Sequence, residues 1–229
     1  MSKNLSTVAV ILAGGLGTRM RSEITKQKMK ICGRSILWRT VRAFESAHSI
    51  DGIVVVSRAE EIDFFKEELR EFSKIIAFTS GGETRRDSAK NGFALCGDFD
   101  FVAIHDGARC MIRPDDIDEI VGAAKIHGAA SAVGRINDTV KLVDADGIIK
   151  ETVPRDYLRA AETPQVFSSE LYEKALGASE GRGVTDDNMM AELVGAKIAA
   201  VETAGYNFKI TTPSDVEYAE FLIERGYSE

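Results

Sequence analysis

A continuous apolar run that opens into a glycine-rich, cationic loop is the feature that most restricts the fold of this chain. The run Val8–Leu12 is rich in β-branched residues, which favours a buried strand. Glycines and cations follow it at Gly14, Gly15, Gly17, Arg19 and Lys26. Backbone N–H groups in such a loop can approach a phosphate closely, and the cations suit a polyphosphate. We therefore expect the first strand of an α/β sheet to end at a triphosphate-binding loop.

Two better-known glycine motifs do not fit this loop. A dinucleotide fingerprint needs a third glycine where Met20 stands, and a Walker A loop needs a Gly-Lys-Ser/Thr step that this loop lacks. A plainer interpretation, in which the glycines only make a tight turn after a core strand, stays open. Arg19 and Lys26 favour phosphate binding over a simple turn.

Composition and charge exclude several classes of protein. The chain has 229 residues, of which 44% are hydrophobic and 28% charged, and this suits one globular domain with a large core. Its net charge of −7 argues against a nucleic-acid binder, although local cations can still bind a small anion. The apolar runs are too short to cross a bilayer, and the N-terminus shows no signal-peptide pattern, so we expect no membrane partner. Three widely spaced cysteines fit neither a disulfide framework nor a zinc site, so we expect a cytoplasmic protein.

Apolar and amphipathic stretches alternate along most of the chain, a pattern that predicts a mostly parallel sheet with helices on both faces. The expected strands are Thr7–Leu12, Gly52–Ser57, Ile75–Thr79, Phe99–Ile104, Ala129–Val133, Ile198–Glu202 and Phe208–Ile210. The expected helices are Ser35–Ser46, Glu60–Glu71, Arg86–Leu95, Pro114–Ile126, Ser168–Leu176, Asp187–Leu193 and one that starts at Pro213. The fold class that follows is α/β, with a Rossmann-like sheet flanked by helices.

The sequence pattern changes over Asp138–Val153, where apolar and polar residues alternate around Asp146 and Gly147. An Asp-Gly pair suits a tight turn, and no helix intervenes, so this segment predicts a β-hairpin. We expect the hairpin to project from the main sheet as an arm at about residues 136–158. An antiparallel extension of the sheet edge is the alternative. The chain shows no linker and no internal repeat, so residues 1–229 are expected to form a single domain.

Further polar clusters follow predicted strands, and ligands of open α/β sheets bind beyond the carboxyl ends of the strands. Gly82 and Ser88 belong to a glycine turn that can hold a nucleobase, although an ordinary turn into a capped helix is the simpler interpretation. Asp106 ends an apolar strand, where it can bind a metal or a hydroxyl group or cap a helix. Lys209, within a short apolar segment, indicates an anionic partner unless it faces water at a sheet edge. His105 is expected to pack locally.

The ordered set of these clusters closely resembles a known family. The matching segments are 13–20, 26–27, 81–85, 88, 105–109, 138–141, 152–153, 155, 163–165, 185–187 and 207–213. Over almost its whole length the chain resembles the methylerythritol-phosphate cytidylyltransferases of non-mevalonate isoprenoid biosynthesis. The resemblance implies a nucleotidyltransferase (GT-A-like) fold and a reaction in which CTP and a sugar-alcohol phosphate give a CDP-alcohol and pyrophosphate. It also implies Mg²⁺ or another divalent cation held mainly by the CTP phosphates, with no protein side chain assigned to the metal.

The resemblance also implies roles for individual residues. The expected catalytic cations are Arg19, Lys26, Arg155 and Lys209. The expected CTP-binding residues are Ala13, Gly14, Gly15, Gly17, Gly82, Ser88, Asp106 and Gly107. The expected acceptor-binding residues are Asp106, Arg109, Thr139, Arg155, Thr163, Thr185 and Lys209. In such enzymes the arm swaps across a homodimer, which would bring Thr139 and Arg155 into the partner's site.

The chain departs from the family pattern at a few positions, and none of them removes a charged catalytic group. Thr25 and Cys110 stand where proline is usual, Pro154 where an acidic residue is more frequent, and Glu162 where glutamine is commonest. Two alternatives are a relative that acts on ribitol 5-phosphate and a nucleotide-binding regulatory module without catalysis. The context of Glu162 favours methylerythritol phosphate over ribitol phosphate. The presence of all four expected cations argues against the regulatory module.

Overall fold

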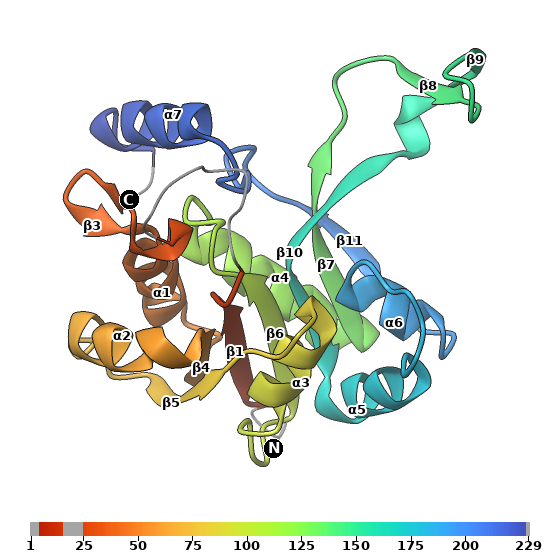
Figure 1. Ribbon diagram of the computed structural model, residues 1–229. Coiled ribbons are helices and arrows are strands. Elements are labelled where there is room, and N and C mark those ends of the chain that lie inside the picture. Colours follow the sequence, from red (N-terminus) through yellow and green to blue (C-terminus); the bar gives the residue numbers. More distant parts are fainter. Residues whose placement is uncertain (1–4, 16–24, 228–229) are drawn as a thin grey trace.

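The computed structural model describes residues 5–15 and 25–227 and confirms the predicted α/β class with a projecting hairpin (Figure 1). Among these residues, seven strands form one sheet in the order β11-β7-β10-β6-β1-β4-β5. They are β1 (Thr7–Leu12), β4 (Gly52–Ser57), β5 (Ile75–Ser80), β6 (Phe101–Asp106), β7 (Ala129–Arg135), β10 (Arg159–Ser168) and β11 (Ala199–Glu202). β10 runs antiparallel to β6 and β7, and the other neighbouring strands are parallel.

Helices pack on both faces of this sheet (Figure 1). The helices on one face are α1 (Ile36–Ser46), α2 (Ile62–Glu68) and α4 (Pro114–His127). The helices on the other face are α3 (Arg85–Phe93), α5 (Ser169–Ala178) and α6 (Asp187–Glu192). None of the helices in the described part of the chain combines the length and the apolar character that crossing a membrane requires.

β1 shows how the sequence creates these two layers. Because side chains alternate across a strand, Ala9 and Ile11 pack with the helices of one face, whereas Val8 and Val10 pack with those of the other. All four side chains are fully buried. A strand buried on both faces must be apolar throughout, which explains why the run Val8–Leu12 contains no polar residue.

The last helix packs beside the main sheet and not on it. α7 (Pro213–Glu224) lies against the short hairpin of β2 (Lys30–Ile31) and β3 (Arg34–Ser35). Ile31, Ile210 and Leu222 form the small core between them. Three-residue 3₁₀ turns are η2 (Lys26–Lys28), η3 (Ala59–Glu61) and η4 (Arg155–Tyr157). This arrangement brings η2, near the start of the chain, close to the segment before α7, near its end.

The arm consists of β8 (Val140–Val143) and β9 (Ile149–Val153), which pair only with each other in an antiparallel sheet. They lie away from the main sheet, at the end of extensions from β7 and β10 (Figure 1). Leu142 and Ile149 are 48% and 60% exposed, so the chain leaves apolar side chains of its own arm uncovered.

The largest difference from the sequence prediction is β10, a ten-residue strand that was not expected. Ala160, Ala161 and Pro164 replace the β-branched residues that usually mark a strand at the centre of a sheet. The pairing of β10 with β7 shifts register between Ala161 and Gln165, so the sheet accommodates a proline that would interrupt a regular ladder.

Other sequence predictions fail on a smaller scale. The strand predicted for Phe208–Ile210 is wrong, because this segment is irregular and is fixed by the Ile210 N–H, which donates to the Ala108 carbonyl oxygen at 2.8 Å. The helix predicted over Glu60–Glu71 is shorter, because η3 precedes it and α2 ends at Glu68. The hairpin of β2 and β3 was not predicted, since its strands contain only two residues each.

Candidate functional site

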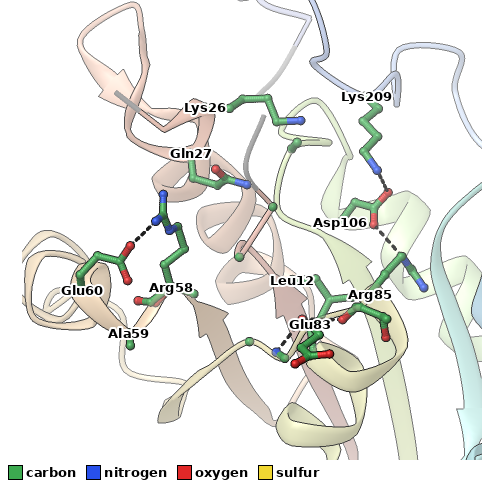
Figure 2. Close-up of a pocket in the computed structure, with 18 of the residues that line it drawn as sticks. Leu12, Lys26, Gln27, Arg58, Ala59, Glu60, Glu83, Arg85, Asp106 and Lys209 are labelled. Carbon is green, nitrogen blue, oxygen red and sulfur yellow. Dashed lines mark hydrogen bonds and ion pairs between the residues drawn. The ribbon is translucent and has the colours of Figure 1, made fainter. Parts of the chain in front are cut away.

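A cavity of about 660 Å³ opens where several parallel strands end (Figure 2). Residues at or just after the ends of β1, β4, β5 and β6 line it: Leu12, Ser57, Gly81 and Asp106. This is the edge at which open α/β sheets bind ligands. The sequence-predicted residues that line the cavity are Gly14, Gly15, Lys26, Gly82, Ser88, Asp106 and Lys209. Figure 2 shows Lys26 and Lys209 extending into the cavity from opposite sides.

Asp106 holds three cations at the edge of this cavity. Its Oδ2 atom lies 2.9 Å from Lys209 Nζ and 3.5 Å from Arg109 Nε, and its Oδ1 atom lies 3.4 Å from Arg85 Nε. Burial raises the pKa of the Asp106 carboxyl, but the charges of these cations outweigh burial and hold the pKa well below its usual range. Asp106 is therefore ionised at neutral pH and orients the side chains around it.

Arg85 links Asp106 to a second, fully buried carboxylate. Its Nη1 atom donates to Asp187 Oδ2, and the Tyr172 hydroxyl donates to Asp187 Oδ1 at 2.7 Å. Burial lowers the pKa of Arg85, but the charges of Asp187 and Asp106 outweigh burial and raise it. Burial also raises the pKa of Tyr172, so its hydroxyl keeps the proton that it donates. The network extends from the cavity edge into the core.

His105 and Thr163 fix the end of β6 behind Asp106. The Thr163 hydroxyl accepts a hydrogen bond from the Asp106 N–H at 3.0 Å and lies 3.1 Å from His105 Nδ1. Burial lowers the pKa of His105 to about 3, so the ring is neutral near pH 7. With its proton on Nε2, the ring donates to the Arg109 carbonyl oxygen at 3.2 Å and accepts from Thr163 at Nδ1. The expectation that His105 packs locally is confirmed.

The glycine turn after β5 is fixed by its own hydrogen bonds. The Gly82 N–H donates to Ser88 Oγ at 3.1 Å, and Ser88 Oγ donates to the Thr84 carbonyl oxygen at 3.0 Å. Thr84 and Asp87 form a capping box at the start of α3. A Cβ atom on Gly82 would lie 2.4 Å from the Asp87 Cβ, so the turn requires glycine. This agrees with the simpler interpretation of the turn, although Gly82 and Ser88 also line the cavity.

Some predicted site residues lie beneath the cavity and do not line it. Ala13 and Gly107 are buried, and their N–H groups donate to the carbonyl oxygens of Val56 and Leu12. Thr163 is 3% exposed and lies behind Asp106. Arg109 Nη1 donates to the Asn207 carbonyl oxygen at 2.7 Å. These residues shape the floor of the cavity, and their expected contacts with substrate stay predictions.

Other predicted residues are remote from the cavity or outside the described residues. Thr139 and Arg155 are exposed on the arm, where Arg155 donates to the Asn137 carbonyl oxygen. Thr185 is exposed just before α6. None of these three lines the cavity of its own chain. The remaining predicted residues, Gly17 and Arg19, lie outside the described residues.

Sequence reasoning assigned no role to several residues that the structure brings to the cavity. Arg58, Glu60 and Gln27 line it, as does Arg85 with its partner Asp187 behind it. Arg58 directly follows the last residue of β4, so its place at a strand end was a usable signal. The pairing of Arg85 with Asp187 left no local signal, because 102 residues separate them in the sequence.

Departures from the family pattern are accommodated within the chain. Glu162 Oε2 accepts hydrogen bonds from Thr203 Oγ1 at 2.9 Å and from Asn207 Nδ2 at 3.0 Å. Cys110 is buried in the small core beside α7, and burial raises the pKa of its thiol to about 12. Pro154 is exposed and precedes η4. These side chains replace no member of the Asp106 network.

The side chains at the cavity suit an anionic ligand better than a free metal ion. In residues 5–15 and 25–227, no group of three or more His, Cys, Asp and Glu side chains is arranged to hold a metal. The carboxylates that line the cavity are Glu60, Glu83 and Asp106. Asp106 is already paired with cations. A metal that arrives with its own phosphate ligands would fit this donor set.

Comparison with known proteins agrees with this geometry. The family model for 2-C-methyl-D-erythritol 4-phosphate cytidylyltransferase matches residues 7–225. The relative of that name from Endomicrobium trichonymphae is 39% identical, over 96% of this chain and 100% of its own. Another, from Clostridium perfringens strain SM101, is 39% identical over 95% and 98% of the two chains.

Solved structures with the same fold lead to the same family. The 4-diphosphocytidyl-2C-methyl-D-erythritol synthase of Anaerococcus prevotii is 28% identical, with a TM-score of 0.87 over 97% of both chains. The 2-C-methyl-D-erythritol 4-phosphate cytidylyltransferase of Thermus thermophilus is 26% identical, with a TM-score of 0.79 over 96% and 100% of the two chains. The chain therefore belongs to the 2-C-methyl-D-erythritol 4-phosphate cytidylyltransferase family.

Proposed function

We propose that this protein transfers CMP from CTP to 2-C-methyl-D-erythritol 4-phosphate and releases pyrophosphate, as a step of non-mevalonate isoprenoid biosynthesis. The observation that carries the proposal is the placement of Lys26 and Lys209 at one cavity, beside Asp106 and two glycine turns. Both reactants are polyanions, so their mutual repulsion is the main obstacle to reaction. Cations fixed in advance at the cavity offset that repulsion.

The reaction needs little covalent chemistry from the protein. An oxygen of the acceptor phosphate attacks the α-phosphorus of CTP in line with the leaving group. A new P–O bond forms while the bond from the α-phosphorus to the bridging oxygen breaks, and pyrophosphate leaves with the electron pair. The attacking oxygen is already an anion, so no general base is required. Positioning and charge stabilisation account for the catalysis.

On the nucleotide side, we assign the triphosphate to Lys26 together with Arg19. The cytosine and ribose belong to the glycine turns that include Gly14, Gly15 and Gly82. The N–H groups of Gly14 and Gly15 donate no hydrogen bond to any described residue, and this supports their use by a ligand. Backbone groups in a rigid turn read a base edge with little loss of conformational entropy.

On the acceptor side, we assign the phosphates near the reacting centre to Lys209, whose Nζ atom is oriented by Asp106. Asp106, Arg109, Thr163 and Thr185 are the remaining acceptor residues that we propose in the same chain. Lys209 is 38% exposed, so its side chain can exchange part of its contact with Asp106 for a phosphate oxygen.

We propose that Thr139 and Arg155 complete the site of a second copy in a homodimer. The arm carries them away from their own cavity and leaves Leu142 and Ile149 uncovered, as expected for a segment that packs on another chain. A guanidinium such as that of Arg155 can bind the acceptor phosphate through two parallel hydrogen bonds.

A divalent cation, Mg²⁺, completes the proposed reaction. The phosphates of CTP would hold it, and no protein side chain is assigned to the ion, because Asp106 is already paired with Lys209 and Arg85. When bound, the ion neutralises charge on the triphosphate. We also propose that residues 1–229 form one catalytic domain with its arm at about 136–158, which the single main sheet supports. The free cysteines support a cytoplasmic location.

Pyrophosphate release tests the proposed function. The assay combines CTP, UTP, ATP or GTP with 2-C-methyl-D-erythritol 4-phosphate or with ribitol 5-phosphate. We expect release with CTP and methylerythritol phosphate. Release with ribitol 5-phosphate alone would show that ribitol phosphate is the acceptor. CTP binding without release under any condition would show that the protein is a regulatory module and not an enzyme.

A further inference from the structure

The turn that carries Lys26 is too short to hold its shape alone. η2 contains only Lys26–Lys28, and two hydrogen bonds define it: Lys28 N–H to the Thr25 carbonyl oxygen at 3.0 Å and Met29 N–H to the Lys26 carbonyl oxygen at 3.1 Å. A single 3₁₀ turn has poor hydrogen-bond geometry and depends on its surroundings. The direction of the Lys26 side chain therefore depends on what fixes the residues on either side of it.

Glu61 contacts both sides of this turn. Thr25 Oγ1 donates to Glu61 Oε1 at 2.6 Å, and Lys28 Nζ lies 3.3 Å from the same oxygen. Lys28 Nζ also lies 4.6 Å from the centre of the Phe64 ring. Glu61 ends η3, which follows β4, so these contacts connect the Lys26 turn to the sheet.

The burial of Glu61 argues against a role in stability alone. Its side chain is 3% exposed, and its Oε2 atom is buried with no hydrogen-bond partner among the described residues. A buried carboxylate with one oxygen unpaired destabilises a fold relative to an apolar residue of similar size. The feature that Glu61 does secure is the position of Thr25 and Lys28, the two residues that flank Lys26.

We propose that Glu61 is a positioning residue for Lys26. Through Thr25 and Lys28 it fixes the η2 turn, so that Lys26 reaches the triphosphate without an ordering step on binding. This inference depends on the proposed role of Lys26 in binding the triphosphate of CTP. Glu61 itself touches no substrate, because it does not line the cavity.

Isothermal titration of the full-length protein with CTP and Mg²⁺ tests the inference. Glu61→Ala removes both contacts, and we expect roughly tenfold weaker CTP binding, as for the loss of a charged hydrogen-bond pair. Thr25→Val removes only the hydroxyl and should weaken binding a few-fold. In steady-state kinetics both variants should raise the KM for CTP and leave the KM for the acceptor unchanged. Should Glu61→Ala fail to fold, Glu61→Gln and Thr25→Val carry the same test.

A proline at position 25 separates positioning from general stability. Thr25 has φ −65° and ψ 145°, and a proline ring fixes φ near this value. In the Glu61→Ala background, Thr25→Pro should therefore recover much of the lost CTP affinity. Thr25→Val in the same background should not recover it. A role of Glu61 in stability alone predicts equal affinities for the two double variants once both are folded.

Two single variants complete the design. Asp63→Asn is the matched control, since the Asp63 side chain is 98% exposed, lies two residues from Glu61 and pairs with Lys66. Lys26→Ala is the reference for loss of the lysine. If Lys26→Ala weakens CTP binding while Glu61→Ala and Thr25→Val do not, the inference is wrong and the proposed function stands. If Lys26→Ala leaves CTP binding unchanged, both the triphosphate assignment and the inference are wrong.

Discussion

The Asp106 network and the arm both carry predicted substrate-binding residues, yet they are built in opposite ways. Asp106, Arg85 and Asp187 are cross-linked by ion pairs and lie against the core. On the arm, Arg155 is exposed, and among the described residues its side chain donates only to the backbone of Asn137. The difference supports the proposal that each chain fixes the Asp106 side of its own site in advance, whereas its arm acts on a second chain.

The largest expected effect comes from Lys209, the cation of the network that is exposed at the cavity. Lys209→Ala should lower kcat by about 10³-fold, because the reacting phosphates lose a fixed positive charge. The melting temperature should change little, since Lys209 is partly exposed. Pyrophosphate release measures the loss, and Lys174→Ala, an exposed lysine on α5, is the control. Near-normal turnover of Lys209→Ala would show that the network does not lie at the reacting centre.

Breaking the network in the core should cost stability. Asp187→Asn leaves the Arg85 guanidinium and the Tyr172 hydroxyl facing an amide, and we expect about 3 kcal/mol less free energy of unfolding. Urea denaturation measures this quantity. Asp156→Asn, on the exposed η4 turn, should change it by less than about 0.5 kcal/mol. Equal effects at the two positions would show that the network is no more rigid than the arm.

The arm should affect the acceptor and not the nucleotide. Arg155→Ala should lower kcat/KM for the acceptor by about 10²-fold, through loss of a bidentate phosphate contact. The Kd for CTP should stay the same, because Arg155 does not line the nucleotide cavity. Lys150→Ala, also exposed on the arm, serves as the control. A loss of CTP affinity as large as the loss of kcat/KM for the acceptor would show that the arm binds the nucleotide.

The smallest expected effect is a pH dependence of stability within the network. Burial lowers the pKa of His105 to about 3, below its ordinary value of 6.5. The unfolded chain therefore takes up a proton first as the pH falls, and the folded state loses stability from about pH 6.5 downward. Between pH 7 and pH 5 this loss should amount to about 2 kcal/mol. Urea denaturation at both pH values measures the free energy of unfolding, and His105→Asn should lose about 2 kcal/mol less than the wild type between them. The same pH dependence in both proteins would show that the His105 ring is not buried and neutral.

The sequence predicted the parts of the molecule that depend on local pattern. The bounds of β1 and β4 are correct because their apolar runs end at glycine or polar residues. Gly82, Asp106 and Lys209 were placed near one another from the rule that ligands bind at strand ends. β10 was missed because its alanines and Pro164 are not typical strand residues. Its stability comes from pairing with β6 and β7 on either side. Long-range pairing of this kind leaves no periodicity to detect.

The same limit applies to the site. Arg85 and Asp187 meet across 102 residues, and the contact between Thr25 and Glu61 crosses 36. Each of these side chains looks like an ordinary surface charge or hydroxyl in the sequence. Only the folded chain brings these side chains together beside Lys26 and Asp106, because their geometry depends on the packing of helices and strands that are distant in sequence.

Subunit complementation tests the central claim most directly. Lys209→Ala impairs a chain's own cavity, and Arg155→Ala impairs only the arm that the chain offers to its partner. After the two inactive variants are mixed, unfolded and refolded together, a mixed dimer contains one intact site. The account predicts recovery of about one quarter of the wild-type turnover, because about half of the dimers are mixed and each has one working site of two. A mixture that stays as inactive as its components would show that the cavity and the arm act within one chain.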